Sequence, residues 1–321
     1  MATQISEVTT KKQLLEFIKF AWQIYSADPN WVPPLISDRE FMLTAKNPFW
    51  QHAERKLWLL KKDGKLVGRI AAIIDHNYLK FQQEQAGFFG FYESINDQAV
   101  ADELLNTAAA WLKQRGMKKI YGPISPSTND EIGFVYEGYD SPPKLMMTYN
   151  PQYYLTLMAN HGLVKAKDVY AYIMQVEDAP QGKLAKVWEK VMQREDGLTV
   201  RPMNLNDFKN EVDRAIHIYN NAWEKNWGFV PWTKEEFTAI AKQLKPLFVP
   251  EITALAEVNG EPVGILITVP DYNEVFKHLN GKLGPLELLK FFKLKKQIQG
   301  LRLLIMGVVR GYRNRGIEAV M

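Results

Sequence analysis

Residues Asp63–Asp75 read DGKLVGRIAAIID, and residues Asn259–Asp271 read NGEPVGILITVPD. The two stretches share glycine, valine, glycine and aspartate at a constant offset: Gly64, Val67, Gly68 and Asp75 recur as Gly260, Val263, Gly264 and Asp271. The Asp-Gly and Asn-Gly pairs favour a type I′ turn, so each stretch predicts a strand, a tight turn and a second strand. The first strands are expected at 56–61 and 252–258, and the second strands at 65–74 and 262–269.

The similarity between the two halves extends beyond the hairpins. Apolar residues at helical spacing precede each hairpin: Leu14, Leu15, Ile18 and Ala21 in one half, and Val212, Ala215, Ile216 and Tyr219 in the other. Another apolar run follows each hairpin, GFFGFY at Gly87–Tyr92 and LLIMGVV at Leu303–Val309. The shared order of helix, hairpin, third strand and helix predicts an internal duplication.

The rest of the chain fits a two-module organisation. Residues 97–115 predict a helix that stops at Gly116, followed by a strand at 118–124, a helix at 151–160 and a closing strand at 169–176. A helix at 183–194 is expected to link the halves, and the strand 198–203 to open the second one. We therefore expect a first module at 1–178, a linker helix within 179–197 and a second module at 198–321.

Composition excludes several classes of function. The 321 residues contain no cysteine, which removes thiol catalysis, iron–sulfur clusters and thiolate zinc sites. The five histidines are scattered, so we expect no metal site, and a net charge of +4 without a dense basic stripe does not indicate nucleic-acid binding. The polar start predicts no signal peptide, and no apolar stretch is long enough for a membrane span, so the expected location is cytoplasmic.

The strongest functional signal follows the last predicted strand, where Arg310–Met321 reads RGYRNRGIEAVM. The first N–H groups of a helix have no internal partner and lie in the positive potential of the helix dipole. Gly316 permits an anion to approach the backbone closely, and Arg313 and Arg315 add positive charge. This turn predicts a pyrophosphate site. The other interpretation is a solvated basic turn that starts an ordinary helix.

These residues resemble the phosphate loop of the GNAT superfamily of N-acetyltransferases. The family pattern Q/R-x-x-G-x-G/A aligns with Arg313–Glu318, although Glu318 stands where the family prefers glycine or alanine. The resemblance implies an α/β (α+β) fold of two tandem GNAT-like modules, each a twisted mixed sheet flanked by helices. It also implies coenzyme contacts from these residues: Val308 and Val309 for the pantetheine arm, and Arg313, Asn314, Arg315, Gly316 and Ile317 for the pyrophosphate.

By this resemblance the chain is an N-acyltransferase that uses acetyl-CoA, or another acyl-CoA, as co-substrate and passes the acyl group directly to a small amine. A homodimer is left open. A non-catalytic binding or scaffold protein of the same fold is the alternative. The first module departs from the family, because its junction at Phe91–Asp102 has carboxylates and no glycine or arginine. We expect Asn96 or Asp97 to cap the following helix there, and no coenzyme site.

The catalytic base and the acceptor pocket are less defined. Asp271 and Glu274 follow the second hairpin and are candidates to remove the amine proton, with solvated loop carboxylates as the other interpretation. Trp227, Trp232 and Tyr272 are candidates for the wall of the substrate pocket, and core packing is the alternative for the tryptophans.

Two segments complete the expectations. The insertion after Asp271 contains a lysine-rich amphipathic helix, interpreted as a lid, as a membrane or partner surface, or as a helix packed on the sheet. The family's acid tyrosine would follow Met321, where a complete module would have about 55 further residues. Two interpretations are open: the chain is a fragment, or the second module is incomplete.

Overall fold

Both copies of the repeat fold into the predicted hairpin. In the computed structural model, which describes residues 3–178 and 180–321, Asp63 and Gly64 have φ of 51° and 77°, and Asn259 and Gly260 have φ of 51° and 83°. Positive φ at both central residues is the requirement of a type I′ turn. The strands that these turns join are β2 (Ala53–Lys62) and β3 (Lys65–Asp75) in the first copy, and β9 (Thr253–Val258) and β10 (Glu261–Pro270) in the second.

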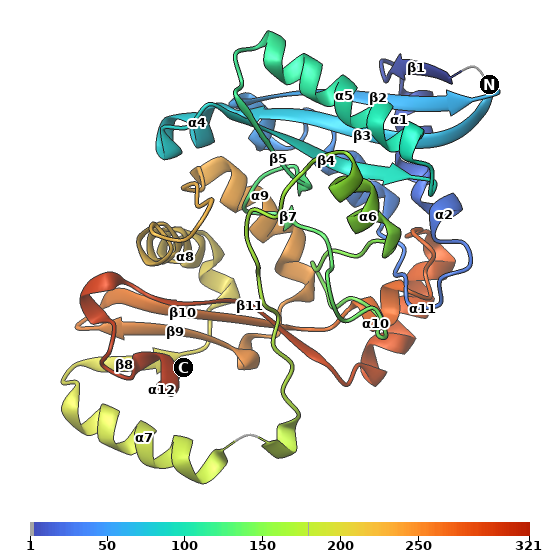
Figure 1. Ribbon diagram of the computed structural model, residues 1–321. Helices are drawn as coiled ribbons and strands as arrows, with labels where there is room; N and C mark the ends of the chain where they lie inside the picture. The colour runs from blue at the N-terminus through green and yellow to red at the C-terminus, as the bar shows by residue number, and fades with distance from the viewer. Residues whose placement is uncertain (1–2, 179) are drawn as a thin grey trace. The chain divides into compact units, whose positions relative to one another are not determined.

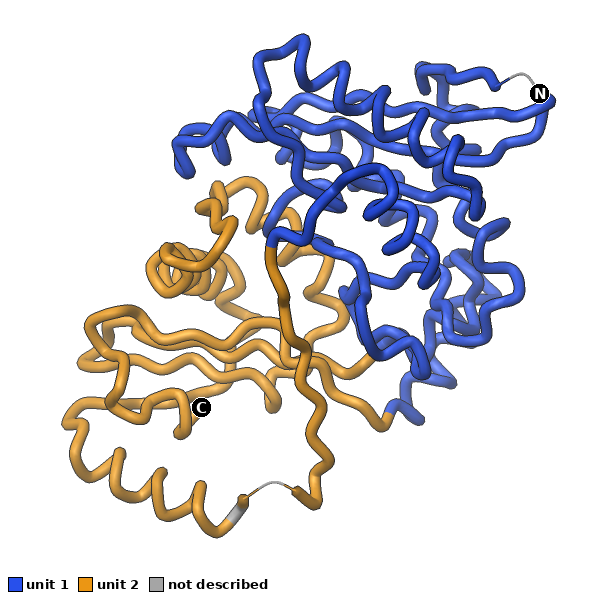
Figure 2. Tube along the Cα trace, in the orientation of Figure 1, with its two compact units in different colours: residues 1–166, 272–298 blue, residues 167–271, 299–321 orange. Residues whose placement is uncertain are grey.

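The chain divides into two units, and each unit is built from two separate stretches of sequence. Unit 1 comprises residues 1–166 and 272–298, and unit 2 comprises residues 167–271 and 299–321 (Figure 2). The inserted segment 272–298 therefore belongs to unit 1, although it interrupts the hairpin of unit 2 between β10 and β11 (Leu301–Val308). The lysine-rich helix that it contains is therefore part of unit 1.

Unit 1 is built on a five-stranded sheet in the order β1-β2-β3-β4-β5 (Figure 1). Its pairs are antiparallel except β4 with β5, which are parallel, so the sheet is mixed as predicted. The parallel pairing extends only from Ala86 to Phe88 of β4. The remaining strands of the unit are β1 (Thr3–Glu7), β4 (Ala86–Ser94), β5 (Lys119–Tyr121) and the short pair β6 (Ile124–Ser125) and β7 (Glu131–Ile132).

The helix α5 (Gln98–Gln114) supplies most of the core over β3. Val100, Leu104, Ala108 and Trp111 recur at helical spacing and are buried with Ile70 and other sheet residues. The other helices of unit 1 are α1 (Lys11–Lys19), α2 (Ala21–Ile24), α3 (Ile36–Met42), α4 (His76–Gln82), α6 (Tyr153–Asn160), α10 (Asn273–Phe276) and α11 (Pro285–Leu294).

Unit 2 has a four-stranded sheet in the order β11-β10-β9-β8, and all its pairs are antiparallel, so the sheet of this unit is not mixed as expected. Helices cover both faces. Leu255 and Ile265 contact residues of α8 and α9, whereas Ala256 and Val263 contact residues of α7 and α12. The remaining elements are α7 (Gln181–Arg194), β8 (Leu198–Arg201), α8 (Phe208–Ala222), α9 (Lys234–Leu244) and α12 (Ile317–Val320).

The predicted closing strand at 169–176 is wrong. The segment has no regular structure up to a short 3₁₀ turn at Val176–Asp178, and Tyr172 and Ile173 are 89% and 80% exposed. Apolar alternation alone cannot make a strand when no neighbouring edge pairs with it. The helix predicted at 183–194 is present as α7, which starts two residues earlier and belongs to unit 2, and the strand predicted at 118–124 is limited to β5.

Two properties of the described residues bear on function. None of the helices in the described residues combines the length and the hydropathy that crossing a bilayer requires. Within the same residues, no group of three or more His, Asp or Glu side chains is arranged to hold a metal ion.

Candidate functional site

The strand β11 runs directly into the predicted loop. A 3₁₀ turn at Arg310–Tyr312 follows the strand, Asn314 has φ of 62°, and Gly316 has φ of 81° immediately before α12. Ile317 is fully buried against Val191 and fixes the loop to the core of unit 2. The tight glycine turn between strand and helix is therefore present where the sequence predicts it.

The backbone of this loop offers free donors. The N–H groups of residues 314–318 have no hydrogen-bond acceptor in the part of the chain that the structure describes, and no side chain caps α12. Consecutive unpaired N–H groups in a turn with left-handed residues form an anion-binding concavity. These amides are the feature best suited to a pyrophosphate.

The basic side chains of the loop are engaged with the protein's own groups. Arg313 donates through Nε to the Val308 carbonyl at 3.1 Å and through Nη2 to the Ala222 carbonyl. Arg315 lies over the Tyr312 ring and 3.4 Å from the Glu195 carboxylate. Arg313 thus braces the loop against α8, and the Arg315 side chain is 44% exposed.

The edge of β11 beside the loop is unpaired in the four-stranded sheet. Val309 donates its N–H to the Val263 carbonyl at 2.9 Å, and alternate residues of a strand point to opposite edges, so the N–H of Val308 faces the unpaired edge. The register of β10 and β11 shifts between Ile267 and Thr268, which marks a bulge in β11 near Leu304. An extended ligand arm along this edge would meet strand donors before the bulge.

Unit 1 has the corresponding strand, but its edge is covered. The pairing of β3 with β4 also shifts, and Phe91 in the bulge of β4 has φ of 49°. The Ser125 hydroxyl accepts the N–H of Phe91 at 2.8 Å, and a Cβ on Gly90 would lie 1.9 Å from the Ile124 carbonyl oxygen. The chain itself therefore occupies the space that is open beside β11.

The start of α5 in unit 1 is also closed to an anion. Asp97 caps this helix, as predicted, by accepting the N–H of Ala99 at 3.0 Å and that of Val100 at 3.4 Å. A hydrogen bond from Lys62 lowers the pKa of Asp97, so the cap carries a negative charge at neutral pH. A coenzyme phosphate would meet a carboxylate in place of free amides.

Asp271 lies at the other end of the sheet from the loop. It is only 1% exposed, so the interpretation as a solvated carboxylate is wrong for this residue. Gly264 is paired with Val308, and Asp271 follows seven residues later, about 23 Å away along an extended strand. Glu274 is half-buried in the first turn of α10 and belongs to unit 1, so the two candidates lie in different units.

The three candidates for the substrate pocket lie in different environments. Trp232 packs edge-on against Phe237 in the core between α8 and α9, whereas Trp227 is 45% exposed. Tyr272 is buried in unit 1, stacked on Phe291 with ring centroids 5.7 Å apart. Burial raises the pKa of the Tyr272 hydroxyl. Trp232 therefore has the packing role that was the alternative interpretation.

A buried polar cluster in unit 1 was not predicted as a site. The Glu93 carboxylate accepts hydrogen bonds from Tyr154 at 2.6 Å and Tyr25 at 3.1 Å, and Arg69 lies 3.4 Å away. Burial raises the pKa of Glu93. Burial also lowers the pKa of Arg69, because it outweighs the opposite effect of the Glu93 charge. The sequence showed Glu93 only as one of several carboxylates after a strand, and its partners come from segments up to 68 residues away.

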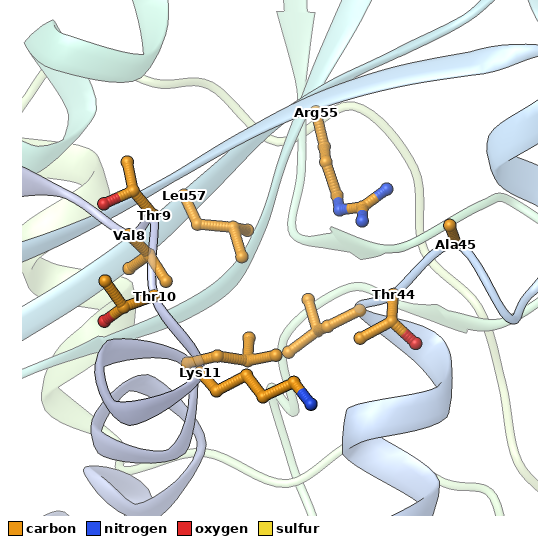
Figure 3. A pocket seen from close by; sticks show the side chains of 10 residues that line it. Val8, Thr9, Thr10, Lys11, Thr44, Ala45, Arg55 and Leu57 are labelled. Atoms are coloured by element: carbon orange, nitrogen blue, oxygen red, sulfur yellow. The ribbon is translucent and has the colours of Figure 1, made fainter.

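A cavity of about 510 Å³ lies in unit 1 near the start of α1 (Figure 3). Its wall contains the cations Lys11 and Arg55, and the Arg55 guanidinium stacks 4.0 Å from the centre of the Trp50 ring. None of the site residues predicted from the sequence lines it. The lining residues are Val8, Thr9, Thr10, Lys11, Leu14, Leu43, Thr44, Ala45, Arg55 and Leu57.

Known proteins resemble this chain in sequence and in fold. The model of the acetyltransferase (GNAT) family matches residues 18–136, within unit 1. The chain is 36% identical over 314 residues to protein YghO of Escherichia coli (strain K12), covering 97% of this chain and 80% of that protein. It is 34% identical over 313 residues to a bacterial ceramide synthase of Caulobacter vibrioides (strain NA1000 / CB15N), covering 95% and 80%.

A solved structure has the same tandem arrangement. A tandem GNAT protein from the clavulanic acid biosynthesis pathway superposes with a TM-score of 0.50 at 10% identity, covering 99% of this chain and 83% of that one. At this identity the similarity concerns the fold alone, and it spans both halves of the repeat.

Proposed function

Because the chain belongs to the GNAT superfamily of acyltransferases and is built as two tandem modules, we propose that it transfers an acyl group from an acyl-coenzyme A directly to an amine. The second module holds the coenzyme and the first does not. The observation that carries this proposal is the row of free amides at residues 314–318 beside the unpaired edge of β11.

The contacts of this site suit an extended coenzyme. The amides of Asn314, Arg315, Gly316 and Ile317 would donate to the pyrophosphate, with the Arg315 guanidinium close enough to add charge. The N–H of Val308 would donate to the pantetheine arm, and the bulge near Leu304 would place a further strand donor at the thioester carbonyl. In direct transfer the protein positions both substrates and needs no covalent intermediate.

Asp271 is the better of the two candidates for the base. A coenzyme arm that left the phosphate loop along β11 would run toward the end of the sheet where Leu301 pairs with Pro270. Asp271 is the next residue after Pro270, so its buried carboxylate lies in the direction of the arm, three residues beyond Thr268 at the bulge. A carboxylate there would accept the proton that the amine loses on acylation. Glu274 remains the second candidate, and Trp227 the exposed aromatic candidate for the acceptor site.

The first module supports the reaction without binding the coenzyme. Ser125 already occupies the Phe91 amide, and Asp97 occupies the amides at the start of α5. In the second module the corresponding positions, the edge of β11 and the amides of residues 314–318, are unpaired in the described residues. We propose that unit 1 has a structural role.

Two donor and acceptor classes deserve direct comparison. The family description favours an acetyl group. The relative described as a bacterial ceramide synthase, 34% identical over 95% of the chain, favours a fatty acyl group and a long-chain amino alcohol, since a ceramide is the amide of these two. We propose the long-chain pair, because that relative aligns with almost the whole chain.

A non-catalytic binding protein is the alternative function. Two observations favour it: Glu318 places a carboxylate in the first turn of α12, and Arg313 is committed to carbonyls of the protein itself. Both weaken the attraction for a pyrophosphate.

The experiment titrates the full chain with acetyl-CoA and with palmitoyl-CoA by calorimetry, and then measures free thiol release in the presence of an amine. A short polyamine and a long-chain 2-amino alcohol serve as the two acceptors. We expect binding of both coenzymes and thiol release with palmitoyl-CoA and the amino alcohol. If a coenzyme binds but no combination of coenzyme and amine releases thiol, the result supports the non-catalytic alternative. Absence of binding refutes the coenzyme site.

A further inference from the structure

The inserted segment 272–298 is held firmly on unit 1. Trp22 donates its indole N–H to the Asn280 side chain at 2.7 Å, and Ile36 donates its N–H to the Gly281 carbonyl at 3.0 Å. At its start, Asn273 donates to the Pro143 carbonyl at 2.7 Å. These contacts fix the start of α10 and the turn that leads into α11, so α11 is presented from an ordered base.

Only one stripe of α11 faces this base. Phe291 stacks on Tyr272 and Phe276, with ring centroids 5.7 and 6.3 Å apart and planes within 22° of parallel. Glu287 and Leu294, one turn before and almost one turn after Phe291, are half-buried, and no residue of the helix is fully buried. The rest of the helix faces outward.

The outward face is apolar, which is the reverse of an ordinary surface helix. Leu286, Leu289 and Phe292 follow one another at three-residue spacing and are 77%, 70% and 52% exposed. Leu283 and Leu288 beside them are 47% and 39% exposed. A contiguous group of large exposed apolar side chains on a helix marks an interaction site, because single exposed residues would be scattered.

Lysines border this apolar face. Lys293 is exposed and lies on the same side of the helix as Leu286 and Leu289, since each residue advances 100° around the axis. Lys296 is exposed in the 3₁₀ turn that follows α11. The segment 272–298 contains six lysines and two glutamates, so it accounts for the whole net charge of +4 of the chain. The long stems of such lysines can extend past apolar groups and keep the ammonium at a polar boundary.

We propose that α11 lies in the interface of an anionic lipid bilayer, with Leu286, Leu289 and Phe292 among the acyl chains and Lys293 and Lys296 at the lipid phosphates. A bilayer accepts a convex apolar helix face with a basic border, and apolar burial and electrostatic attraction together set the strength of such binding. An acidic protein partner would need a groove shaped to this helix. A membrane needs none, which is why the bilayer is the favoured occupant.

The proposal does not depend on acyl transfer, because it concerns a different surface from the phosphate loop. Its test is sedimentation of the full chain with vesicles of phosphatidylcholine alone and of phosphatidylcholine with phosphatidylglycerol. We expect binding to the anionic vesicles, weaker at high salt. The triple variant Leu286→Ser, Leu289→Ser and Phe292→Ser should bind about tenfold or more weakly, since its exposed apolar contacts are lost. Lys293→Gln with Lys296→Gln should reduce the preference for the anionic vesicles.

Helix α7 provides a matched control. It is also basic and amphipathic, and its Leu184 and Trp188 are 43% and 49% exposed, so Leu184→Ser with Trp188→Ser should leave vesicle binding unchanged. Circular dichroism melting of every variant checks that it folds. Failure of the wild-type chain to bind anionic vesicles at low salt overturns the proposal, as does unchanged binding by the triple variant. A wild-type dimer that the triple variant abolishes, without vesicle binding by either, would assign the face to a second copy and likewise overturn it.

Discussion

The coenzyme site can be tested by comparing two glycines of unit 2 that share a backbone conformation. Gly316 in the phosphate loop has φ of 81°, and Gly260 in the hairpin turn has φ of 83°. An alanine Cβ at Gly316 would lie 2.8 Å from Cγ2 of Val191, whereas nothing lies within 4 Å of a Cβ at Gly260. The pair Gly316→Ala and Gly260→Ala therefore separates a general backbone effect from a local displacement of the loop.

The expected magnitudes differ in a defined way. Both variants place a side chain in the left-handed region, which costs about 1–2 kcal/mol of folding free energy. At Gly316 the loop must also move away from Val191, and the amides of residues 314–318 lose their common direction. A hydrogen bond to a charged group contributes about 1.5–3 kcal/mol, so the loss of one such bond to the pyrophosphate weakens binding by about 10- to 150-fold.

The measurement is a calorimetric titration of coenzyme A into the wild-type chain and both variants. Thermal melting should show a loss for both variants, about 2–4 °C for each kcal/mol, and the larger loss for Gly316→Ala because of its contact with Val191. Only Gly316→Ala should weaken coenzyme binding. If Gly316→Ala binds as tightly as the wild type, or if Gly260→Ala weakens binding as much, the amides beside β11 do not hold the coenzyme.

Three further predictions concern unit 1. Gly281→Ala would place a Cβ 2.5 Å from the Trp22 ring, so limited proteolysis should cut residues 272–298 faster than in the wild type, and unchanged protection would contradict this. In Asp97 the hydrogen bond from Lys62 lowers the pKa, so its stabilisation is present above pH 3.8 and is lost as the pH falls below that value. Asp97→Asn should keep the cap, because an asparagine oxygen also accepts the helix N–H groups. Its urea midpoint should fall less steeply than that of the wild type between pH 4 and pH 2, because unfolding of the variant takes up about one proton fewer. Tyr154→Phe removes a donor to buried Glu93 and should lower the free energy of unfolding by about 1–3 kcal/mol in guanidinium chloride, and a change near zero would show that water replaces the hydroxyl.

The parts of the fold that local chemistry determines were predictable. The Asp63-Gly64 and Asn259-Gly260 turns fixed both hairpins, because few residue pairs accept positive φ at successive positions. The amphipathic spacing within 97–115 gave α5, and Asp97 was among the two expected caps. The tandem GNAT architecture, inferred from the repeat and the Arg313–Glu318 pattern, is confirmed by the structure of a tandem GNAT protein and by the family match.

Features that depend on distant partners were not predictable. The stretch 169–176 has the composition of a strand, but pairing depends on an edge that the sequence does not reveal, and it is exposed instead. Segment 272–298 gives no local sign that it belongs to unit 1, since its anchors Trp22 and Ile36 lie more than 240 residues earlier. For the same reason the sequence indicates the positive charge of Arg313, but not the hydrogen bond that Arg313 donates to the Ala222 carbonyl, 91 residues away.

The exchange of segment 272–298 changes how this protein can be dissected. The backbone passes from one unit to the other three times, after residues 166, 271 and 298. A fragment ending at residue 166 lacks segment 272–298, which contacts Trp22. A fragment starting at residue 167 contains that segment but lacks the residues of unit 1 on which it packs. One protease cut between the halves leaves two further connections, so the nicked product should migrate as an undivided particle until a denaturant is added. The two units should also evolve together, because no single continuous stretch of the gene encodes either unit completely.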